Sequence, residues 1–141
     1  LVNVASLAGF FPLPHKAVYS ASKRFIIQFS LALREEVKDF GNVTVLCPGG
    51  LPTNPEAMKK IFLQGFWGKL TAHDTHEVVK RTLEKVGRNV PIYTPGIPNR
   101  FLAWLGGVLP ANWVAGYSAR RWGEKQSRLD YWRMMNKSQE N

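Results

Sequence analysis

Hydrophobic residues follow two alternating patterns along the first part of the chain. Residues 1–5 and 43–47 are short apolar, β-branched runs bounded by turn residues, and such runs are typical of buried strands. Between them, apolar residues recur at steps of three and four from Lys16 to Asp39, which predicts an amphipathic helix that Gly41 ends. The residues in this pattern are Val18, Ser22, Phe25, Ile26, Phe29, Leu33 and Val37. A strand, a long helix and a strand form a βαβ unit with parallel strands.

The same alternation continues after residue 73. Asp74 and Glu77 have the spacing of a capping box, in which each side chain accepts from the other's backbone N–H, and a second helix is predicted from there to Gly87. Its inward face is expected to carry Val79, Leu83 and Val86. Residues 90–93 predict a short third strand, which Pro91 places at a sheet edge because proline cannot donate to the ladder. The fold class is therefore α/β.

Two segments depart from the alternation. Residues 54–70 are an apolar insertion that can be ordinary core or a lid over a substrate, and its aromatic content favours a lipophilic substrate. Residues 97–141 form a C-terminal helical extension with four of the five Trp. The uncharged run 101–119 is long enough to span a membrane, but Pro110 and Asn112 favour two shorter helices. These helices are interpreted as a cover near the substrate mouth or as a membrane surface contact by 100–121.

Length and composition indicate one globular domain. The chain has 141 residues, and we divide it into a catalytic segment 1–53, a lid 54–70, a helix and last strand 71–96, and the extension 97–141. It opens at Leu1 inside an apolar run, so we expect a single incomplete domain that begins on a strand. The single cysteine excludes an internal disulfide and favours the cytoplasm, either free or peripheral to a membrane.

The net charge of +9 does not identify a partner by itself. Basic residues are spread over both parts of the chain and no nucleic-acid motif accompanies them, so we expect no nucleic acid partner. The three His and Cys47 lack the spacing of a zinc site, so no metal is expected. Cys47 is interpreted as a small buried hydrophobe.

Candidate chemistry lies at the start of the long helix and at the ends of the two strands. Tyr19 and Lys23 are four positions apart, so both lie on nearly one line of the helix surface. A cation held beside a phenol favours the phenolate, which makes such a pair suited to proton transfer. Ser6 follows the first strand, at the edge where open parallel sheets place ligands. After the second strand, Pro48-Gly49-Gly50-Leu51-Pro52-Thr53 allows close backbone approach to a flat ligand.

In this order and spacing the residues resemble the short-chain dehydrogenase/reductase family. The motifs are Asn3-Val-Ala-Ser6-Leu-Ala-Gly9, Tyr19-x-x-x-Lys23 and Pro48-Gly49-x-x-x-Thr53, and the resemblance covers residues 1–95. It implies that the chain is the C-terminal half of a Rossmann-like three-layer parallel-sheet domain. It also implies hydride transfer between NAD or NADP and a carbonyl or alcohol. Tyr19 would be the general acid/base, Ser6 would polarise the substrate oxygen, and Lys23 would activate Tyr19 and hold the nicotinamide ribose.

The resemblance also implies cofactor contacts, and it shows that one cofactor-binding motif of the family is missing from the chain. Leu51 would contact the carboxamide and Thr53 the cofactor phosphate, whereas the family's glycine-rich turn has no counterpart in the chain. The chain alone is therefore expected to be inactive. Family members commonly pair through the long helix, so a homo-oligomer is expected. Two alternatives are a hydrolase triad of Ser6 and His15, which lacks the GxSxG elbow, and a silent chain whose Trp-rich C-terminal segment binds a membrane or a protein.

Overall fold

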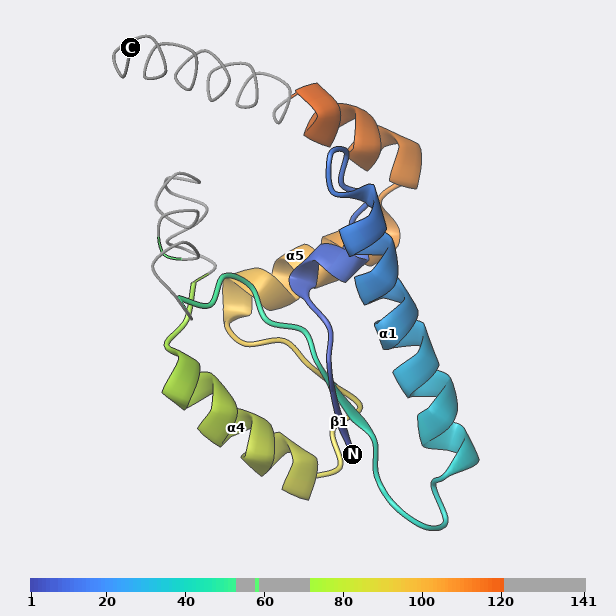
Figure 1. The fold of residues 1–141 in the computed structure, drawn as a ribbon, viewed down its shortest axis with the longest axis vertical. Helices are drawn as coiled ribbons and strands as arrows, with labels where there is room; N and C mark the ends of the chain where they lie inside the picture. The colour runs from blue at the N-terminus through green and yellow to red at the C-terminus, as the bar shows by residue number, and fades with distance from the viewer. Residues whose placement is uncertain (53–57, 59–71, 121–141) are drawn as a thin grey trace, which may run out of the picture.

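The core of the molecule is a parallel sheet with helices on both sides (Figure 1). The computed structural model describes residues 1–52, 58 and 72–120. Within these residues, strand β1 (Val2–Val4) pairs with β2 (Thr44–Leu46), and β2 pairs with β3 (Ile92–Tyr93). Helix α1 (Ala17–Glu36) lies on one side of the strands and α4 (Thr75–Gly87) on the other. The order β1-β2-β3 confirms the predicted α/β class, and β3 has the outer position predicted from Pro91.

The two strands of the βαβ unit differ in burial. All of β2 is buried, and Val45 and Thr44 are fully inaccessible. The prediction that residues 1–5 are also buried is wrong for most of the run, since Leu1, Val2 and Val4 are exposed and only Ala5 is buried. The reason is that β1 has the other outer position of the described sheet, so only β2 flanks it and the face carrying Val2 and Val4 is left uncovered.

Helix α1 forms where it is predicted, and its last helical residue is Glu36 rather than Asp39. Its buried side chains are Ser20, Ile27 and Ser30. Among the large residues of the apolar pattern, Val18, Phe25 and Phe29 are exposed and Ile26, Leu33 and Val37 are half-buried. Val18 is 85% exposed. Small polar residues face the sheet because they make specific contacts there: Asn3 Nδ2 of β1 donates to Ser30 Oγ at 3.0 Å. The apolar periodicity therefore located the helix but not its buried side.

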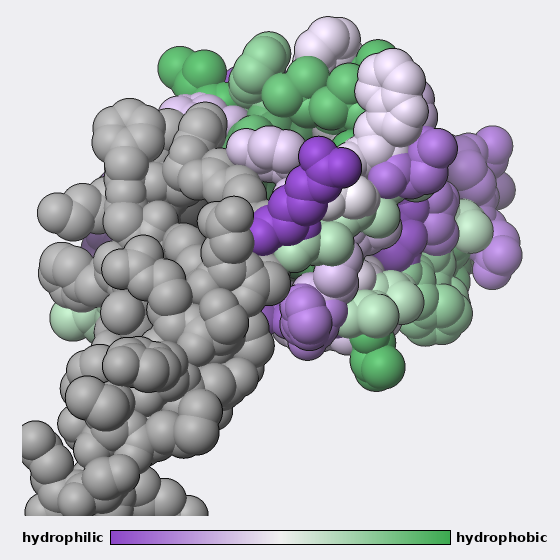
Figure 2. Space-filling view, turned by 90° about the horizontal axis from the view of Figure 1, so that it is seen from above, coloured by the Kyte–Doolittle hydropathy of each residue, from purple (hydrophilic) through white to green (hydrophobic). Residues whose placement is uncertain are grey.

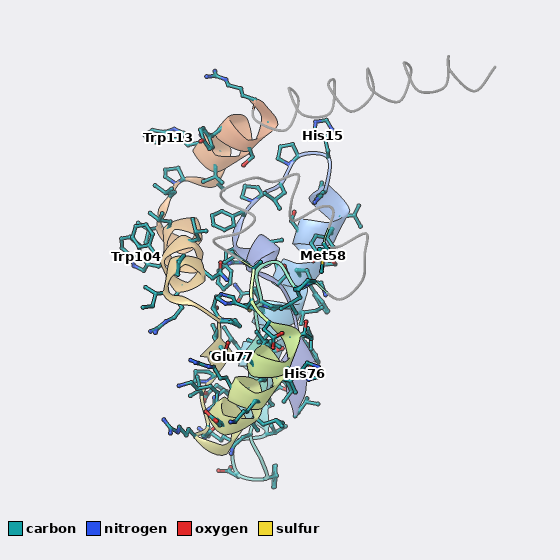
Figure 3. All side chains as sticks on the ribbon, turned by 90° about the vertical axis from the view of Figure 1, so that its left-hand side faces the viewer. His15, Met58, His76, Glu77, Trp104 and Trp113 are labelled. Carbon is teal, nitrogen blue, oxygen red and sulfur yellow. The ribbon has the colours of Figure 1, made fainter. Side chains whose placement is uncertain are left out.

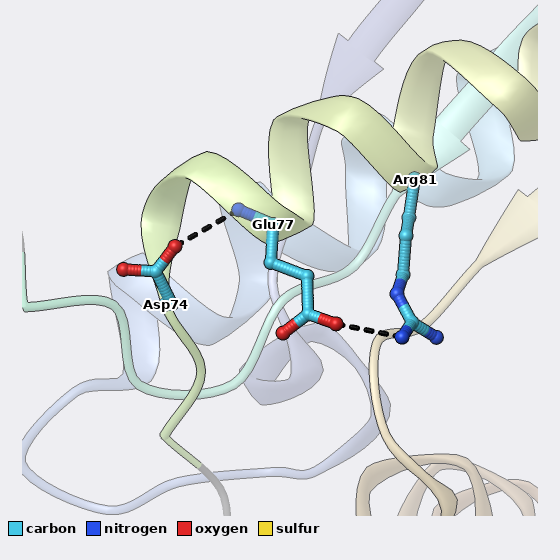
Figure 4. Close-up of polar contacts among 3 residues, drawn as sticks. All are labelled: Asp74, Glu77 and Arg81. Atoms are coloured by element: carbon cyan, nitrogen blue, oxygen red, sulfur yellow. Dashed lines mark hydrogen bonds and ion pairs between the residues drawn. The ribbon is translucent and has the colours of Figure 1, made fainter.

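Helix α4 begins at the predicted cap, but only half of the capping box is made (Figure 4). The Asp74 carboxylate accepts from the Glu77 N–H at 2.9 Å, whereas the Glu77 side chain pairs with Arg81 at 2.6 Å instead of turning back. The predicted inward face is wrong at Val79 and Leu83, which are exposed, and Val86 is half-buried. The helix buries Val78 and Thr82, one position away along the chain. This is possible because the Thr82 hydroxyl donates to Val78 O at 2.6 Å, which satisfies it without water.

Between β3 and residue 120 the chain folds as two helices, as Pro110 and Asn112 predict. Helix α5 (Ile97–Val108) ends at Leu109, whose ψ of 142° is extended, and residues 111–120 are helical again. Helix α5 packs against the short 3-10 helix η1 (Leu7–Phe10). Within the described residues, no helix is long and apolar enough to cross a membrane. The predicted lid 54–70 lies outside the described residues except for Met58, and so does 121–141.

Candidate functional site

The carboxyl ends of β1 and β2 lie side by side, as the sequence predicts for a parallel sheet. The ladder continues past the strands, since Ala5 N donates to Leu46 O at 2.8 Å and Leu7 N donates to Pro48 O at 2.8 Å. Ser6 lies between these two bonds and is therefore held next to the Pro48 turn. The structure thus brings two of the three predicted motifs to one sheet edge.

Ser6 has a defined local role at this edge. It is the N-cap of η1, with an extended backbone and a side-chain oxygen that accepts from the Ala8 N–H at 3.2 Å. The cap fixes the rotamer of the serine, because the oxygen must point back over the first turn of η1. A hydroxyl that accepts one bond still has its own proton to donate. Ser6 can therefore donate a hydrogen bond to a ligand oxygen without losing its structural contact.

Tyr19 and Lys23 occupy the first two turns of α1 and are brought together. The Lys23 Nζ lies 5.9 Å from the centroid of the Tyr19 ring, within cation–π range. The same ammonium donates to Val4 O of β1 at 3.2 Å. Val4 precedes Ser6 by two residues, so Lys23 links the helix to the strand that carries Ser6. The Tyr19 side chain is 46% exposed, which leaves its hydroxyl open to an incoming molecule.

Gly9 holds the segment after Ser6 against α1. A Cβ at Gly9 would lie 2.8 Å from Ile27 Cδ1 and 2.9 Å from the carbonyl carbon of Lys23, both too close for a real contact. Only glycine therefore lets η1 approach the helix turn that carries Lys23. In the sequence, Gly9 marked the end of a strand and part of a motif, and its role in this approach was missed. The signal available was its position three residues after Ser6.

The turn after β2 is described as far as Pro52. Pro48 is buried, Gly49 and Leu51 are half-buried, and Gly50 forms a parallel bridge with Ala72. Thr53, the predicted phosphate contact, lies outside the described residues. The turn is thus tied on one side to the segment after Ser6 and on the other to the segment before α4.

Two further titratable residues near the sheet are placed as the sequence suggested. Burial raises the pKa of the Cys47 thiol to about 12, so this side chain is a neutral small hydrophobe, as predicted. His15 is exposed in the loop before α1, with a positive φ of 62°. The Cys47 thiol therefore contributes no charge to the sheet edge at neutral pH.

An apolar groove of about 570 Å³ runs along the neighbouring side of α1. The loop of residues 10–14, the first turns of α1 and the helices beyond β3 enclose it, and Arg24 is its charged lining residue. Ser6, Tyr19 and Lys23 are not among the described residues that line it. The groove is therefore separate from the cluster at the sheet edge.

Comparison with known proteins identifies the first part of the chain. Residues 1–61 match the family model described as short chain dehydrogenase. A very-long-chain 3-oxoacyl-CoA reductase of Aspergillus oryzae is 31% identical over 119 residues, which cover 77% of this chain and 33% of that protein. An estradiol 17-beta-dehydrogenase 2 of Mus musculus is 31% identical over 90 residues, covering 63% and 22%.

Another match is shorter and higher in identity. The ketoacyl reductase HetN of a Nostoc species is 46% identical over 50 residues, covering 35% of this chain and 17% of that protein. The chain spans about a third of the length of the first curated relatives it matches. No solved structure is significantly similar to it.

Proposed function

Because the chain belongs to the short-chain dehydrogenase family, we propose that it carries the catalytic residues of an NAD(P)-dependent oxidoreductase. The reaction is hydride transfer between a nicotinamide cofactor and a carbonyl or alcohol carbon. The observation that carries the proposal is the position of Lys23, whose ammonium lies beside the Tyr19 ring and bonds the strand leading to Ser6. The cluster contains a proton carrier, a cation and a hydroxyl donor at one sheet edge.

Each of the three side chains has a role that follows from its chemistry. Tyr19 gives a proton to the substrate oxygen during reduction and takes one during oxidation. Lys23 stabilises the phenolate form of Tyr19, because a fixed positive charge favours the anion. Ser6 donates a hydrogen bond to the same substrate oxygen and stabilises the negative charge that develops there.

The residues at the sheet edge also suit a nicotinamide cofactor. Lys23 has further N–H groups beyond the one given to Val4 O, and these can reach ribose hydroxyls. The turn with Pro48, Gly49 and Leu51 offers backbone groups to the cofactor beside the same sheet edge, and Tyr19 lies there as a further cofactor contact. Thr53 is proposed as the contact to the cofactor phosphate. When bound, the cofactor supplies or accepts the hydride. The proposal leaves NAD and NADP as equal candidates.

We propose a lipophilic substrate. The two relatives with the longer matches reported above are named for very-long-chain 3-oxoacyl-CoA and for estradiol, and the acyl chain of the first and the steroid of the second are largely hydrocarbon. The aromatic residues within 54–70 support the same class, since the interpretation of that segment as a lid places them near the substrate.

We also propose that the protein is a homo-oligomer whose subunits pair through α1. The outward side of this helix carries Phe25 and Phe29, which are exposed and whose rings stack with centroids 5.8 Å apart. Exposed stacked aromatics on the side of a helix that faces away from its own sheet are suited to burial against a second copy. The expected location is the cytoplasm, with residues 100–121 in contact with a membrane surface. Residues 1–141 in isolation are expected to be inactive, since the glycine-rich cofactor turn has no counterpart in them.

Reduction of a 3-oxoacyl thioester by the full-length protein with NADPH or NADH tests the reaction. Tyr19→Phe keeps the ring and removes only the transferable proton, so kcat should fall about 10²- to 10⁴-fold with an unchanged circular dichroism spectrum. Tyr117→Phe is the matched control, because Tyr117 lies on the helix 111–120 away from the sheet edge, and it should keep full activity. A Tyr19→Phe protein that keeps more than a tenth of kcat would remove Tyr19 from the mechanism.

A further inference from the structure

The two described helices beyond β3, α5 and residues 111–120, carry large apolar and aromatic side chains on their exposed sides. On α5 the exposed side chains at steps of three and four are Ile97, Phe101, Trp104 and Val108. On the helix 111–120 the exposed aromatics are Trp113 and Tyr117. We call these six residues the aromatic ridge.

The inner faces of the same helices mix small residues with half-buried apolar ones. Gly106 of α5 packs against Phe10, and Gly106, Ala111 and Ala115 line the apolar groove. The half-buried large residues are Leu102, Leu105 and Val114, and Asn99 and Ser118 are buried. An amphipathic surface helix packs through one apolar side, and these residues supply that side. The aromatic ridge is therefore additional apolar surface that the described chain leaves exposed.

The large side chains lie together in space. Trp104 is 60% exposed and Trp113 71% exposed, and both point outward on the same side of the molecule (Figure 3). The rings of Phe101 and Trp104 stack with centroids 5.9 Å apart. In the space-filling view, groups of hydrophobic side chains alternate with hydrophilic ones on the face that is shown (Figure 2). Large exposed aromatic side chains on two successive helices mark a candidate binding surface.

The charge of this part of the chain identifies the partner. Residues 97–120, which hold both helices, contain two basic residues, Arg100 and Arg120, and no acidic residue, so the segment has a charge of +2. Tryptophan, tyrosine and phenylalanine accompanied by arginine are the residues that settle at the headgroup level of a bilayer. Anionic headgroups attract each nearby basic side chain, whereas a neutral apolar protein surface has no charge to pair with these arginines.

The dimensions of the helices fix how they meet the bilayer. Helix α5 has 12 residues, so it is about 18 Å long, while the hydrocarbon core is about 30 Å thick. The extended backbone at Leu109 separates it from the helix 111–120. Within the described residues neither helix is long enough to cross the core, so an orientation in the plane of the surface is the one open to them.

We infer that the aromatic ridge binds an anionic lipid bilayer, with Trp104 and Trp113 inserted at the headgroup level and Arg100 and Arg120 beside the phosphates. This inference rests on the membrane contact proposed above, and it is independent of the reductase chemistry. It assigns a ligand chemistry and an orientation to that contact.

Sedimentation of the full-length protein with vesicles tests the inference. The protein should bind vesicles of phosphatidylcholine with about 30% phosphatidylserine, an anionic content that gives a strong surface potential. It should bind vesicles of phosphatidylcholine alone at least tenfold more weakly. The Trp104→Ser/Trp113→Ser protein should lose at least tenfold in partition coefficient, while Trp104→Tyr/Trp113→Tyr should keep most of it. Arg100→Gln should cost about fivefold.

Phe40→Ser is the matched control. Phe40 is 89% exposed and lies in the turn after α1, away from the aromatic ridge, so its loss should leave vesicle binding unchanged. Reductase activity without vesicles should be equal in all these variants, which separates failure of this inference from failure of the proposed reaction. Equal binding to neutral vesicles, an equal loss in Phe40→Ser, or a change of oligomeric mass in Trp104→Ser/Trp113→Ser without vesicle binding would each overturn the inference.

Discussion

Two neighbouring glycines of α5 lie in opposite environments. A Cβ added at Gly106 would lie 2.6 Å from Phe10 O and 2.9 Å from Phe10 Cβ, both in η1. A Cβ added at Gly107 would meet no atom within 4 Å. The same substitution, glycine to alanine, is therefore expected to have opposite effects on stability at two adjacent positions of one helix.

The magnitude follows from two competing contributions. Alanine is favoured over glycine inside a helix by about 1 kcal/mol, and Gly107→Ala should gain close to that amount. At Gly106 the nearest atom belongs to the backbone and cannot rotate away, so the overpacking cost should be in the upper part of the usual range of about 1–3 kcal/mol. Gly106→Ala should therefore lose about 1–2 kcal/mol after the helix gain. The two variants should differ by about 2–3 kcal/mol.

Thermal unfolding of the full-length protein, followed by circular dichroism, measures this difference. A gap of 2–3 kcal/mol corresponds to about 5–10 °C in Tm for a domain of ordinary size. Activity gives a second measurement, because η1 begins at the Ser6 cap and a displaced η1 moves that hydroxyl. Gly106→Ala should lower kcat, and Gly107→Ala should not. Equal Tm values for the two variants would refute the close packing of α5 on η1.

Three other predictions concern the sheet and its connections. Arg34 donates to Val43 O at 2.8 Å and to Asn89 O at 2.8 Å, so Arg34→Met should lower the free energy of unfolding by about 2 kcal/mol in urea titrations. Asp74→Ala should cost about 1 kcal/mol in the same assay through loss of the α4 cap, and a change below 0.3 kcal/mol, roughly the scatter of surface substitutions, would contradict it. Cys47, whose pKa burial raises to about 12, should resist iodoacetamide at pH 8 until the protein unfolds, and stability should fall as pH rises from about 9 toward 12, because only the unfolded thiol ionises there.

The elements of this fold could be predicted from the sequence more fully than their orientation. Both helices form at the predicted residues because capping and stop signals are local. Their buried faces differ from the prediction because the sheet surface selects residues by fit. Ser30 faces β1 since Asn3 offers it a partner, and Thr82 is buried since its hydroxyl bonds its own helix. Hydrophobic periodicity contains neither piece of information.

The candidate site likewise has one part that the sequence predicts and one part that it does not. The spacing of Tyr19 and Lys23 placed their side chains together because four residues make about one helical turn. The bond from Lys23 to Val4 O and the approach allowed by Gly9 depend on how α1 lies on β1, which no local pattern encodes. Sequence could name the chemical groups, and only the packing of the helix on the strand shows what holds them.

The outward faces of α1 and α5 differ in charge, and this difference predicts different partners. The α1 face with Phe25 and Phe29 is followed by the acidic pair at 35–36, which an anionic bilayer would repel, whereas the face with Trp104 and Trp113 lies in a segment without acids. Phe25→Ser/Phe29→Ser should therefore lower the oligomeric mass measured by light scattering and leave vesicle binding per subunit unchanged. Trp104→Ser/Trp113→Ser should do the reverse, and Phe40→Ser should change neither. If either double variant changed both measurements, one continuous surface would serve both purposes, and charge would not be what separates the two faces.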